Sequence, residues 1–343
     1  MENIKKSSDK NSTEVVIGGV KFYCCELDSN DGAHLVELHQ LVFGKAFTLD
    51  ILNWKYLSRN SPSLGLWNSD GTLVAHCAGI ARQIILRGVS FNGLQICDVV
   101  VHPKWRAILT KQGPFFWVSK LFYKLQIGVH CPHQIGYGFP SHRHMRLAEK
   151  LNLGCDAGPI WELSWQINSE NDIKHPWHWQ AIELNEGSAQ WQEYIQRAWA
   201  NMCVASTALS LGDRSSTELD WRYRQHPSHQ HFYTALKRPW SRHASGVAIW
   251  RYTDTGAILW LDWIGAPSDL ARAQRMLAHR HLAAPNSELQ TWGSDLIRMA
   301  LRHTPGYSER LVACIGIPFE SNLDFTNLDR NLWWWMAGDT DFL

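Results

Sequence analysis

The chain has 343 residues, 45% of them hydrophobic and 19% charged, a composition typical of a folded globular protein with room for two domains. Lysine plus arginine (33) nearly balance aspartate plus glutamate (32), without any run of like charge, which disfavours a nucleic-acid partner. No segment reaches the ~18 consecutive apolar residues of a membrane span. The eight cysteines are scattered and contain no Cys-x-x-Cys pattern, so we expect reduced thiols, a cytoplasmic location and no metal centre.

The first half predicts an ordered series of strands and helices after a disordered tail at residues 1–14. A strand pair turns at Gly18–Gly19, and residues 34–47 carry apolar side chains at helical spacing. Residues 73–86 then alternate in the manner of a strand. The nearly continuous apolar stretch at 94–103 is typical of a central strand that is covered on both faces.

The second half repeats this order of elements. Trp54 recurs as Trp221 at a distance of 167 residues, and Asp98 recurs as Asp262 at a distance of 164 residues. Landmarks that keep nearly one offset indicate a duplicated domain. The alternative is one large domain in which the likeness is accidental.

The segment after the first central strand has the features of an anion-binding site. The strand ends at His102, a loop with basic residues follows, and the next helix is predicted to start with a proline, which suits a first helical turn. A helix start preceded by glycine offers unpaired N–H groups and a partial positive charge. Many strand–loop–helix units share this pattern without binding a ligand. The residues that would hold a diphosphate here are Arg106, Lys111, Gln112, Gly113 and Pro114.

Two segments resemble motifs of the GNAT superfamily of acyl-coenzyme A N-acyltransferases. Residues 101–106 (VHPKWR) are similar to the family's V-x-P-x-x-R strand end, and residues 138–153 (GFPSHRHMRLAEKLNL) are similar to its later strand-to-helix segment. The Trp-Lys-Tyr segment and the closing WWWMAGDTDFL resemble a bacterial branch with tandem domains. The resemblance implies an α/β fold of two tandem GNAT-like units, each a mixed, mostly antiparallel sheet flanked by helices.

The resemblance also assigns parts of the chain to functions. Residues 15–168 would form an N-terminal, coenzyme A-binding domain and residues 176–343 a degenerate C-terminal domain, divided in the polar segment NSENDIKHP. Acetyl-CoA or another acyl-CoA would be the co-substrate. Its site would include the loop and Ser141, and the backbone of Val100 and Val101 would donate to the tetrahedral oxyanion.

The sequence departs from the family's pattern at the loop and at the later helix. Arg106 and Gly113 are separated by more residues than the family's compact loop has, which implies a reshaped phosphate site. The family's frequent tyrosine acid falls at Ala148, and a glycine of the same motif falls at Asn152. The usual proton donor to the departing thiolate is therefore missing or supplied from elsewhere.

Transfer of an acyl group to an amine requires a proton acceptor, because an alkylammonium group, with a pKa near ~10, is mostly protonated at neutral pH. Asp98 is one candidate base, since burial in an apolar strand would raise its pKa. Its alternative role is to pin a neighbouring loop by hydrogen bonds. His102 shares strand parity with Asp98 unless a bulge intervenes, and its alternative role is in a surface turn. His142 and His144, at the start of the later helix, are further candidate proton carriers.

These observations predict an enzyme that transfers an acyl group, expected to be acetyl, from coenzyme A to a small-molecule amine by direct attack in a ternary complex. Two alternatives stay open: a tandem aminoacyl- or fatty-acyltransferase of the peptidoglycan-bridge or myristoyl type, and a catalytically inactive acyl-CoA-binding regulatory module. The second half lacks basic residues directly after its central strand, so only the first half is expected to be equipped for catalysis. The acceptor, the acyl chain length and the oligomeric state, a homodimer included, cannot be read from the sequence.

Overall fold

The computed structural model describes residues 12–44, 47–59, 61–106, 112–167, 179–238, 240–241, 243–280, 287–324 and 329–340. Residues 1–11 of the predicted tail, the predicted boundary segment at 168–176 and Lys111 lie outside the described residues. The first strand begins at Thr13, inside the region that was expected to be a tail.

The chain divides into two compact units, and neither unit is a continuous half of the sequence. Unit 1 comprises Met1–Arg82, Phe91–Ala157 and Ile315–Leu328. Unit 2 comprises Gln83–Ser90, Gly158–Cys314 and Asp329–Leu343. Unit 1 therefore includes a short segment from the second half of the sequence, Ile315–Leu328, and unit 2 includes one from the first half, Gln83–Ser90.

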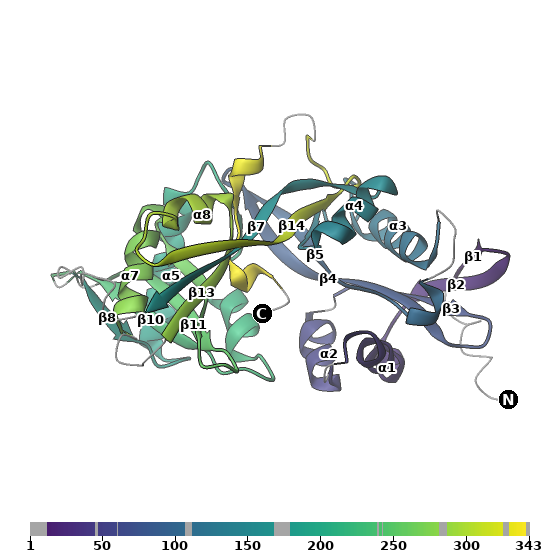
Figure 1. Ribbon diagram of the computed structural model, residues 1–343, viewed down its shortest axis with the longest axis horizontal. Helices are drawn as coiled ribbons and strands as arrows, with labels where there is room; N and C mark the ends of the chain where they lie inside the picture. The colour runs from purple at the N-terminus through teal and green to yellow at the C-terminus, as the bar shows by residue number, and fades with distance from the viewer. Residues whose placement is uncertain are drawn as a thin grey trace. The chain divides into compact units, whose positions relative to one another are not determined.

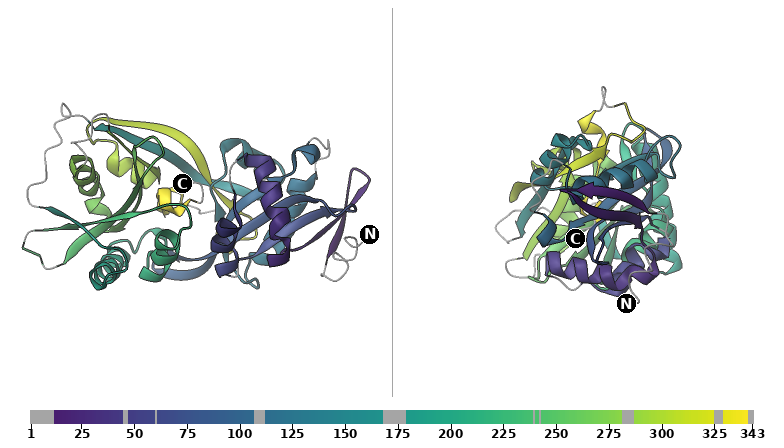
Figure 2. Two further views of the ribbon diagram at one scale, coloured as in Figure 1. Left: turned by 90° about the horizontal axis from the view of Figure 1, so that it is seen from below. Right: turned by 90° about the vertical axis from the view of Figure 1, so that its right-hand side faces the viewer.

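The strands of unit 1 form a mixed sheet in the order β1-β2-β3-β4-β5-β6-β14. Strands β1 to β4 pair antiparallel, β5 and β6 run parallel, and β14 meets β6 antiparallel. Their bounds are β1 Thr13–Ile17, β2 Val20–Glu26, β3 Ser63–Asn68, β4 Leu73–Leu86, β5 Val89–Val101, β6 Ile135–Gly138 and β14 Tyr307–Pro318. The predicted turn at Gly18–Gly19 and the predicted central strand are confirmed, and the β1–β2 hairpin is the purple ribbon near the N-terminus in Figure 2.

Helices cover both faces of the unit 1 sheet, with α1 and α2 on one side and α3 and α4 on the other (Figure 1). Their ends follow local sequence signals. α1 stops at Gly44, which has a φ of 61°, the left-handed conformation that glycine adopts readily at a helix end. Pro114 occupies the first turn of α3, as predicted. The bounds are α1 Gly32–Phe43, α2 Leu49–Lys55, α3 Pro114–Gln126 and α4 His142–Lys150.

The strands of unit 2 repeat this arrangement in the order β8-β10-β11-β12-β13-β7. Strands β12 and β13 run parallel, as β5 and β6 do, and the remaining neighbours pair antiparallel. The bounds are β7 Gly154–Ile167, β8 Gln180–Glu183, β10 Phe232–Lys237, β11 Ala244–Tyr252, β12 Ile258–Gly265 and β13 Ser287–Ser294. A short parallel pair, β9 (Ser210–Gly212) with β15 (Trp333–Trp334), adds to this unit.

The helices of unit 2 also occupy positions that correspond to those of unit 1. One buried cluster joins the sheet to α5, and a second, rich in tryptophan, joins its other face to α7 and α8. The bounds are α5 Ala189–Ala205, α6 Ser216–Leu219, α7 Leu270–Arg280 and α8 Asp295–Leu301. Among the described helices, none combines the length and the apolar composition that crossing a bilayer requires.

The order of strands and helices matches between the two units, as the predicted duplication requires. In both units a parallel strand pair follows an antiparallel meander, and a helix follows each strand of that pair. The last strand of each sheet is exchanged. The first half of the sequence supplies β7 to unit 2, and the end of β14, which comes late in the sequence, belongs to unit 1.

Candidate functional site

The central strand of unit 1 is bulged at Asp98. The φ of Asp98 is 51°, in the left-handed region that residues other than glycine seldom adopt. The Tyr56 hydroxyl lies 3.5 Å from Cys97 Sγ and donates a hydrogen bond to the Asp98 carboxylate. Two successive side chains on one face of a strand are the mark of a β-bulge. The bulge breaks the alternation that would otherwise place Asp98 and His102 on the same face.

Asp98 forms a buried ion pair with Lys55. Lys55 Nζ lies 2.7 Å from Asp98 Oδ2, and the two side chains are 7% and 15% exposed. Burial raises the pKa of Asp98, but attraction to Lys55 and the hydrogen bonds from Lys55 and Tyr56 outweigh burial and hold this pKa below its ordinary value. The expected raised pKa of Asp98 is therefore wrong, because the carboxylate has a buried cation beside it. A carboxylate with a depressed pKa is a weak base, and Asp98 fits the role of an anchor for the end of α2.

The residues that follow the bulge have structural partners. His102 Nδ1 accepts a hydrogen bond from the Lys104 N–H at 3.1 Å and caps the short turn that starts at Pro103. This is the surface-turn role that was the alternative for His102. Val100 is buried, and the Val101 carbonyl accepts from Arg106 Nε at 2.9 Å. The bulge lies at Cys97–Asp98, before the position at which Val100 and Val101 were expected to supply oxyanion donors.

The loop and helix start that were predicted to bind an anion lie at the end of β5. Arg106 and Gln112 are exposed, and Lys111 lies outside the described residues. Gly113 is the N-cap of α3, and because glycine has no side chain it makes no side-chain capping bond to the first turn of this helix. The first backbone bond of the helix runs from the Trp117 N–H to the Gly113 carbonyl at 3.2 Å. A helix start without a side-chain cap is a place where backbone N–H groups can bind an anion.

The start of α4 is basic and lies within electrostatic reach of Arg106. Ser141 accepts a hydrogen bond from the His144 N–H at 3.4 Å, so its hydroxyl acts as the helix cap. Burial, Arg143 and Arg106 all lower the pKa of His144, which places the Arg106 guanidinium near this helix end. An open depression of about 440 Å³ runs along α4 and is lined by His142, Arg143, Arg146, Leu147 and Lys150.

The parallel pair β5–β6 ends next to the bulge. Its register runs from Gly93↔Ile135 to Ile96↔Gly138, and no further pair of described residues continues it toward Asp98. At the last pair the two backbones lie very close, because a Cβ on Gly138 would be only 2.9 Å from the Ile96 carbonyl oxygen. The ladder and β6 both end at this pair, whereas β5 continues into the bulge, and the loop and the start of α3 follow it along the chain.

In unit 2 the corresponding place beside the parallel pair is filled by the C-terminal segment of the chain. Strands β12 and β13 pair only at Ile258↔Leu289 and Leu259↔Gln290. Met336 then forms a bridge to Gly293 of β13. The next turn packs against β12, because a Cβ at Gly338 would lie 3.0 Å from the Leu261 carbonyl oxygen and would collide with the Tyr223 hydroxyl. We refer to residues 336–339 as the C-terminal plug.

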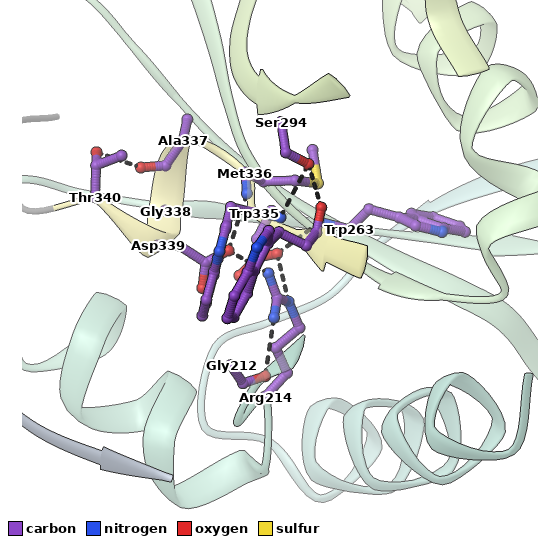
Figure 3. A network of polar contacts seen from close by, with 12 residues as sticks. Gly212, Arg214, Trp263, Ser294, Trp335, Met336, Ala337, Gly338, Asp339 and Thr340 are labelled. Atoms are coloured by element: carbon purple, nitrogen blue, oxygen red, sulfur yellow. Dashed lines mark hydrogen bonds and ion pairs between the residues drawn. The ribbon is translucent and has the colours of Figure 1, made fainter. Parts of the chain in front are cut away.

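A fully buried ion network holds the C-terminal plug in place (Figure 3). Arg214 donates from Nε to Asp262 at 2.8 Å and from Nη2 to Asp339 at 2.5 Å. Tyr223 donates to the other oxygen of Asp262 at 3.2 Å, and Arg222 donates to the Gly338 carbonyl. Burial raises the pKa of Asp262, and the nearby Asp339 adds to this, so the two guanidinium groups do not fully offset the cost of burying the carboxylate.

The two units therefore share a tyrosine–aspartate contact at the same place in the fold. Tyr56 meets Asp98 in unit 1 and Tyr223 meets Asp262 in unit 2. Trp54 and Trp221 were recognised as landmarks of the repeat, but the tyrosines two residues after them, Tyr56 and Tyr223, were missed as site residues. Their similar spacing from the aspartates, 42 and 39 residues, is the signal that could have identified them.

A second group of polar residues in unit 1 was missed entirely. His39 of α1, His76 of β4 and Ser63 of β3 form a buried hydrogen-bonded chain beside Asp98. No sequence pattern connects them, because they lie on three different elements. Among the described residues, no group of three or more His, Cys, Asp or Glu side chains is arranged to hold a metal ion.

The sequence matches no protein-family model and no curated protein. Solved structures do match it. A probable N-acyltransferase from Enterococcus faecalis V583 superposes with a TM-score of 0.64 at 15% identity, covering 87% of this chain and 72% of that one. A GCN5-related N-acetyltransferase from Anabaena variabilis gives 0.64 at 11% identity, covering 86% and 72%. The chain has the GNAT fold. The N-myristoyltransferase of Saccharomyces cerevisiae with bound myristoyl-CoA gives 0.53 at 11% identity, covering 91% of this chain and 86% of that one. The expected GNAT-like fold is thus confirmed.

Proposed function

We propose that the protein is an acyl-CoA-dependent N-acyltransferase whose reaction takes place in unit 1. The observation that carries this proposal is the end of the β5–β6 ladder at Ile96↔Gly138, directly before the Asp98 bulge. Backbone groups of separating strands can bind an extended amide-containing chain such as pantetheine. The GNAT fold shared with proteins named N-acetyltransferases supports the same assignment. We propose acetyl-CoA as the co-substrate and a small-molecule amine as the acceptor, with direct attack in a ternary complex.

The phosphates of the coenzyme are assigned to the basic surface at the starts of α3 and α4. Gln112, Gly113 and Pro114 lead into the first turn of α3, which has no side-chain cap, and backbone N–H groups there favour an anion. Arg106 is close enough to α4 to lower the pKa of His144, and it would add a full positive charge. Lys111 belongs to the same proposed loop. Ser141 supports the site indirectly, because its hydroxyl already caps α4, and His142 lies at the edge of the basic depression.

Fatty-acyl transfer is a second candidate function. The observation in its favour is the likeness to N-myristoyltransferase, which extends over 91% of this chain. Acetyl-CoA and myristoyl-CoA should be compared as ligands, and a clear preference for the longer thioester would select this candidate. Binding of either thioester without turnover over a broad panel of amines would instead indicate the regulatory module.

Replacing Arg106 with alanine is expected to weaken acetyl-CoA binding about tenfold from a Kd on the order of micromolar, because a charge-assisted contact to phosphate is lost. The affinity that remains should depend less on salt concentration. Isothermal titration calorimetry measures both effects. Arg275→Ala, which removes an exposed arginine from α7 of unit 2, is the matched control and should bind like the unchanged protein. Equal affinity for both variants would remove Arg106 from the site.

The same titration is expected to give one acetyl-CoA per chain. Unit 1 has the Arg106 loop, whereas in unit 2 the corresponding place is occupied by the C-terminal plug, with Met336 bridged to Gly293. The unit 2 turn at Pro267–Asp269 also carries an acidic residue where unit 1 has basic ones. Two equivalent sites per chain would contradict the assignment of the reaction to unit 1.

A further inference from the structure

Three buried polar side chains in unit 1 are linked in a chain that the proposed coenzyme site does not use. Ser63 Oγ lies 2.8 Å from His76 Nε2, and His76 Nδ1 lies 3.3 Å from His39 Nε2. His39 and His76 are 1% and 0% exposed, whereas Ser63 is only half-buried. The chain therefore leads from the interior toward solvent, and each of its links can carry one proton.

The inner end of this chain is an unpartnered atom. His39 Nδ1 is buried and has no hydrogen-bond partner among the described residues. Phe47 stacks on the His39 ring at a centroid distance of 4.1 Å, which fixes the plane of the ring and the direction of this nitrogen. Buried polar atoms are nearly always hydrogen-bonded in folded proteins. The unpartnered His39 Nδ1 therefore indicates a place where another polar group binds.

The chain lies beside the bulge of the central strand. Tyr56, which donates to Asp98, packs edge-on against the His76 ring at 6.1 Å. The charged groups that face the two histidines are Lys55 and Asp98. Burial lowers the pKa of His39, with Asp98 and Lys55 acting in opposite directions, and burial followed by the neighbouring His39 lowers the pKa of His76 to about 3. Both rings are consequently neutral at neutral pH, so each has one nitrogen lone pair and one N–H.

We propose that His39, His76 and Ser63 form the proton path of the acyl transfer in unit 1, an inference that rests on the proposed function. In the starting tautomer His39 Nε2–H donates to His76 Nδ1, His76 Nε2–H donates to Ser63 Oγ, and His39 Nδ1 carries a lone pair. The amine enters as the free base. Its nitrogen forms a bond to the thioester carbonyl carbon, the carbonyl π pair moves to the oxygen, and the nitrogen loses one proton to His39 Nδ1. One proton shifts along each link, and Ser63 releases its hydroxyl proton to solvent.

The same chain completes the reaction and returns to its starting state. The carbon–sulfur bond breaks, and the thiolate leaves with the electron pair. His39 Nδ1–H donates its proton to the sulfur, the links shift back, and Ser63 takes up a proton from solvent. The amine has lost one proton, the thiolate has gained one, and the chain is unchanged. This path would supply the acid that the resemblance places at Ala148, where this sequence has no ionisable side chain.

Two measurements test the proton path. The first is ¹⁵N NMR of the histidine rings in the protein without substrate, which needs no acceptor. We expect both rings to be neutral at pH 7 and above, because both pKa values are lowered from 6.5, with His39 protonated on Nε2. A His39 ring protonated on Nδ1, or a ring that is charged at pH 7, overturns the proposal, because its entry atom would have no lone pair.

The second measurement is turnover of the variant His39→Gln with acetyl-CoA and hydroxylamine as the probe nucleophile, followed by release of the free CoA thiol. The glutamine amide can keep the hydrogen bond to His76 but cannot pass a proton on. We expect kcat to fall about 100-fold, the effect typical of losing acid–base help, with an unchanged KM for acetyl-CoA and an altered pH profile. His133→Gln, a buried histidine of unit 1 outside the chain, is the matched control and should keep full turnover.

The outcomes separate this proposal from the proposed function. Full turnover and an unchanged pH profile in His39→Gln refute the path and leave the acyltransferase assignment in place. A protein that does not bind acetyl-CoA in calorimetry refutes both. If His39→Gln does not fold, as judged by circular dichroism, Ser63→Ala takes its place, because it removes the outer end of the chain at a half-buried position. Ser63→Ala is expected to lower kcat without changing acetyl-CoA affinity.

Discussion

Replacing Asp98 with asparagine is expected to lower the free energy of unfolding of unit 1 by about 3–5 kcal/mol, the range for removing one partner of a buried ion pair. The amide keeps the shape of the side chain but takes away the negative charge beside the Lys55 ammonium, which is only 7% exposed. The hydrogen bond from Tyr56 is also weakened. Urea unfolding, followed by tryptophan fluorescence, measures the change.

A double-mutant cycle distinguishes the ion pair from a general disturbance of the bulge. Lys55→Met alone should also be strongly destabilising, because it leaves the Asp98 carboxylate without its cation. The double variant Lys55→Met/Asp98→Asn should be less destabilised than the sum of the two single changes, since it buries no charge at this place. Additive effects would show that Lys55 and Asp98 do not depend on each other, contrary to their 2.7 Å contact.

The pH dependence of stability follows from the same pair. The folded-state pKa of Asp98 lies below its ordinary value, and the unfolded-state value is about 3.9. The stability that the ionised carboxylate contributes is therefore fully present above about pH 4 and is lost as the pH falls through the lower, folded-state pKa. The double variant should lack this part of the acid destabilisation.

The elements and the repeat could be predicted because their signals are local. Helix starts and strand turns depend on residues a few positions apart, as at Pro114 and at Gly18–Gly19. The equivalence of Asp98 and Asp262 rested on an offset of 164 residues, close to the 167 residues between Trp54 and Trp221. In the structure both aspartates accept a hydrogen bond from a tyrosine. The GNAT motifs placed the loop after β5 correctly for the same reason.

The partners of the site residues could not be predicted, because they are distant in sequence. Lys55 and Asp98 are 43 residues apart, and Arg214 and Asp339 are 125 residues apart. Hydrophobic alternation does not reveal a bulge, so the direction of the Asp98 side chain and the sign of its pKa shift were both missed. The closing WWWMAGD segment carried only a family resemblance, and nothing in its composition indicated that it would fill the place beside β12 and β13.

The replacement Arg214→Met is expected to have the largest effect on stability. Arg214 is 0% exposed and lies between Asp262 and Asp339. Its removal leaves two buried carboxylates with less positive charge beside them, and loss of a single buried partner already costs about 3–5 kcal/mol. The C-terminal plug should detach as a consequence. Urea unfolding and limited proteolysis of the plug measure the two effects, and Arg224→Met, which removes an exposed arginine paired with Asp220, is the control that should change little.

The direction in which the stability of Arg214→Met changes with pH shows whether electrostatics or packing causes its loss of stability. Burial already raises the pKa of Asp262 in the unchanged protein, and removing Arg214 takes away a charge that lowers it. A carboxyl whose folded-state pKa is above its unfolded-state value destabilises the folded state at neutral pH, and this penalty disappears as the pH falls and the group becomes protonated. Arg214→Met should therefore be more stable at pH 5 than at pH 8, and adding Asp339→Asn should restore part of the stability at pH 8. A variant that is equally unstable at both pH values would assign the loss to packing around the arginine side chain, and the C-terminal plug would then be held by its apolar contacts.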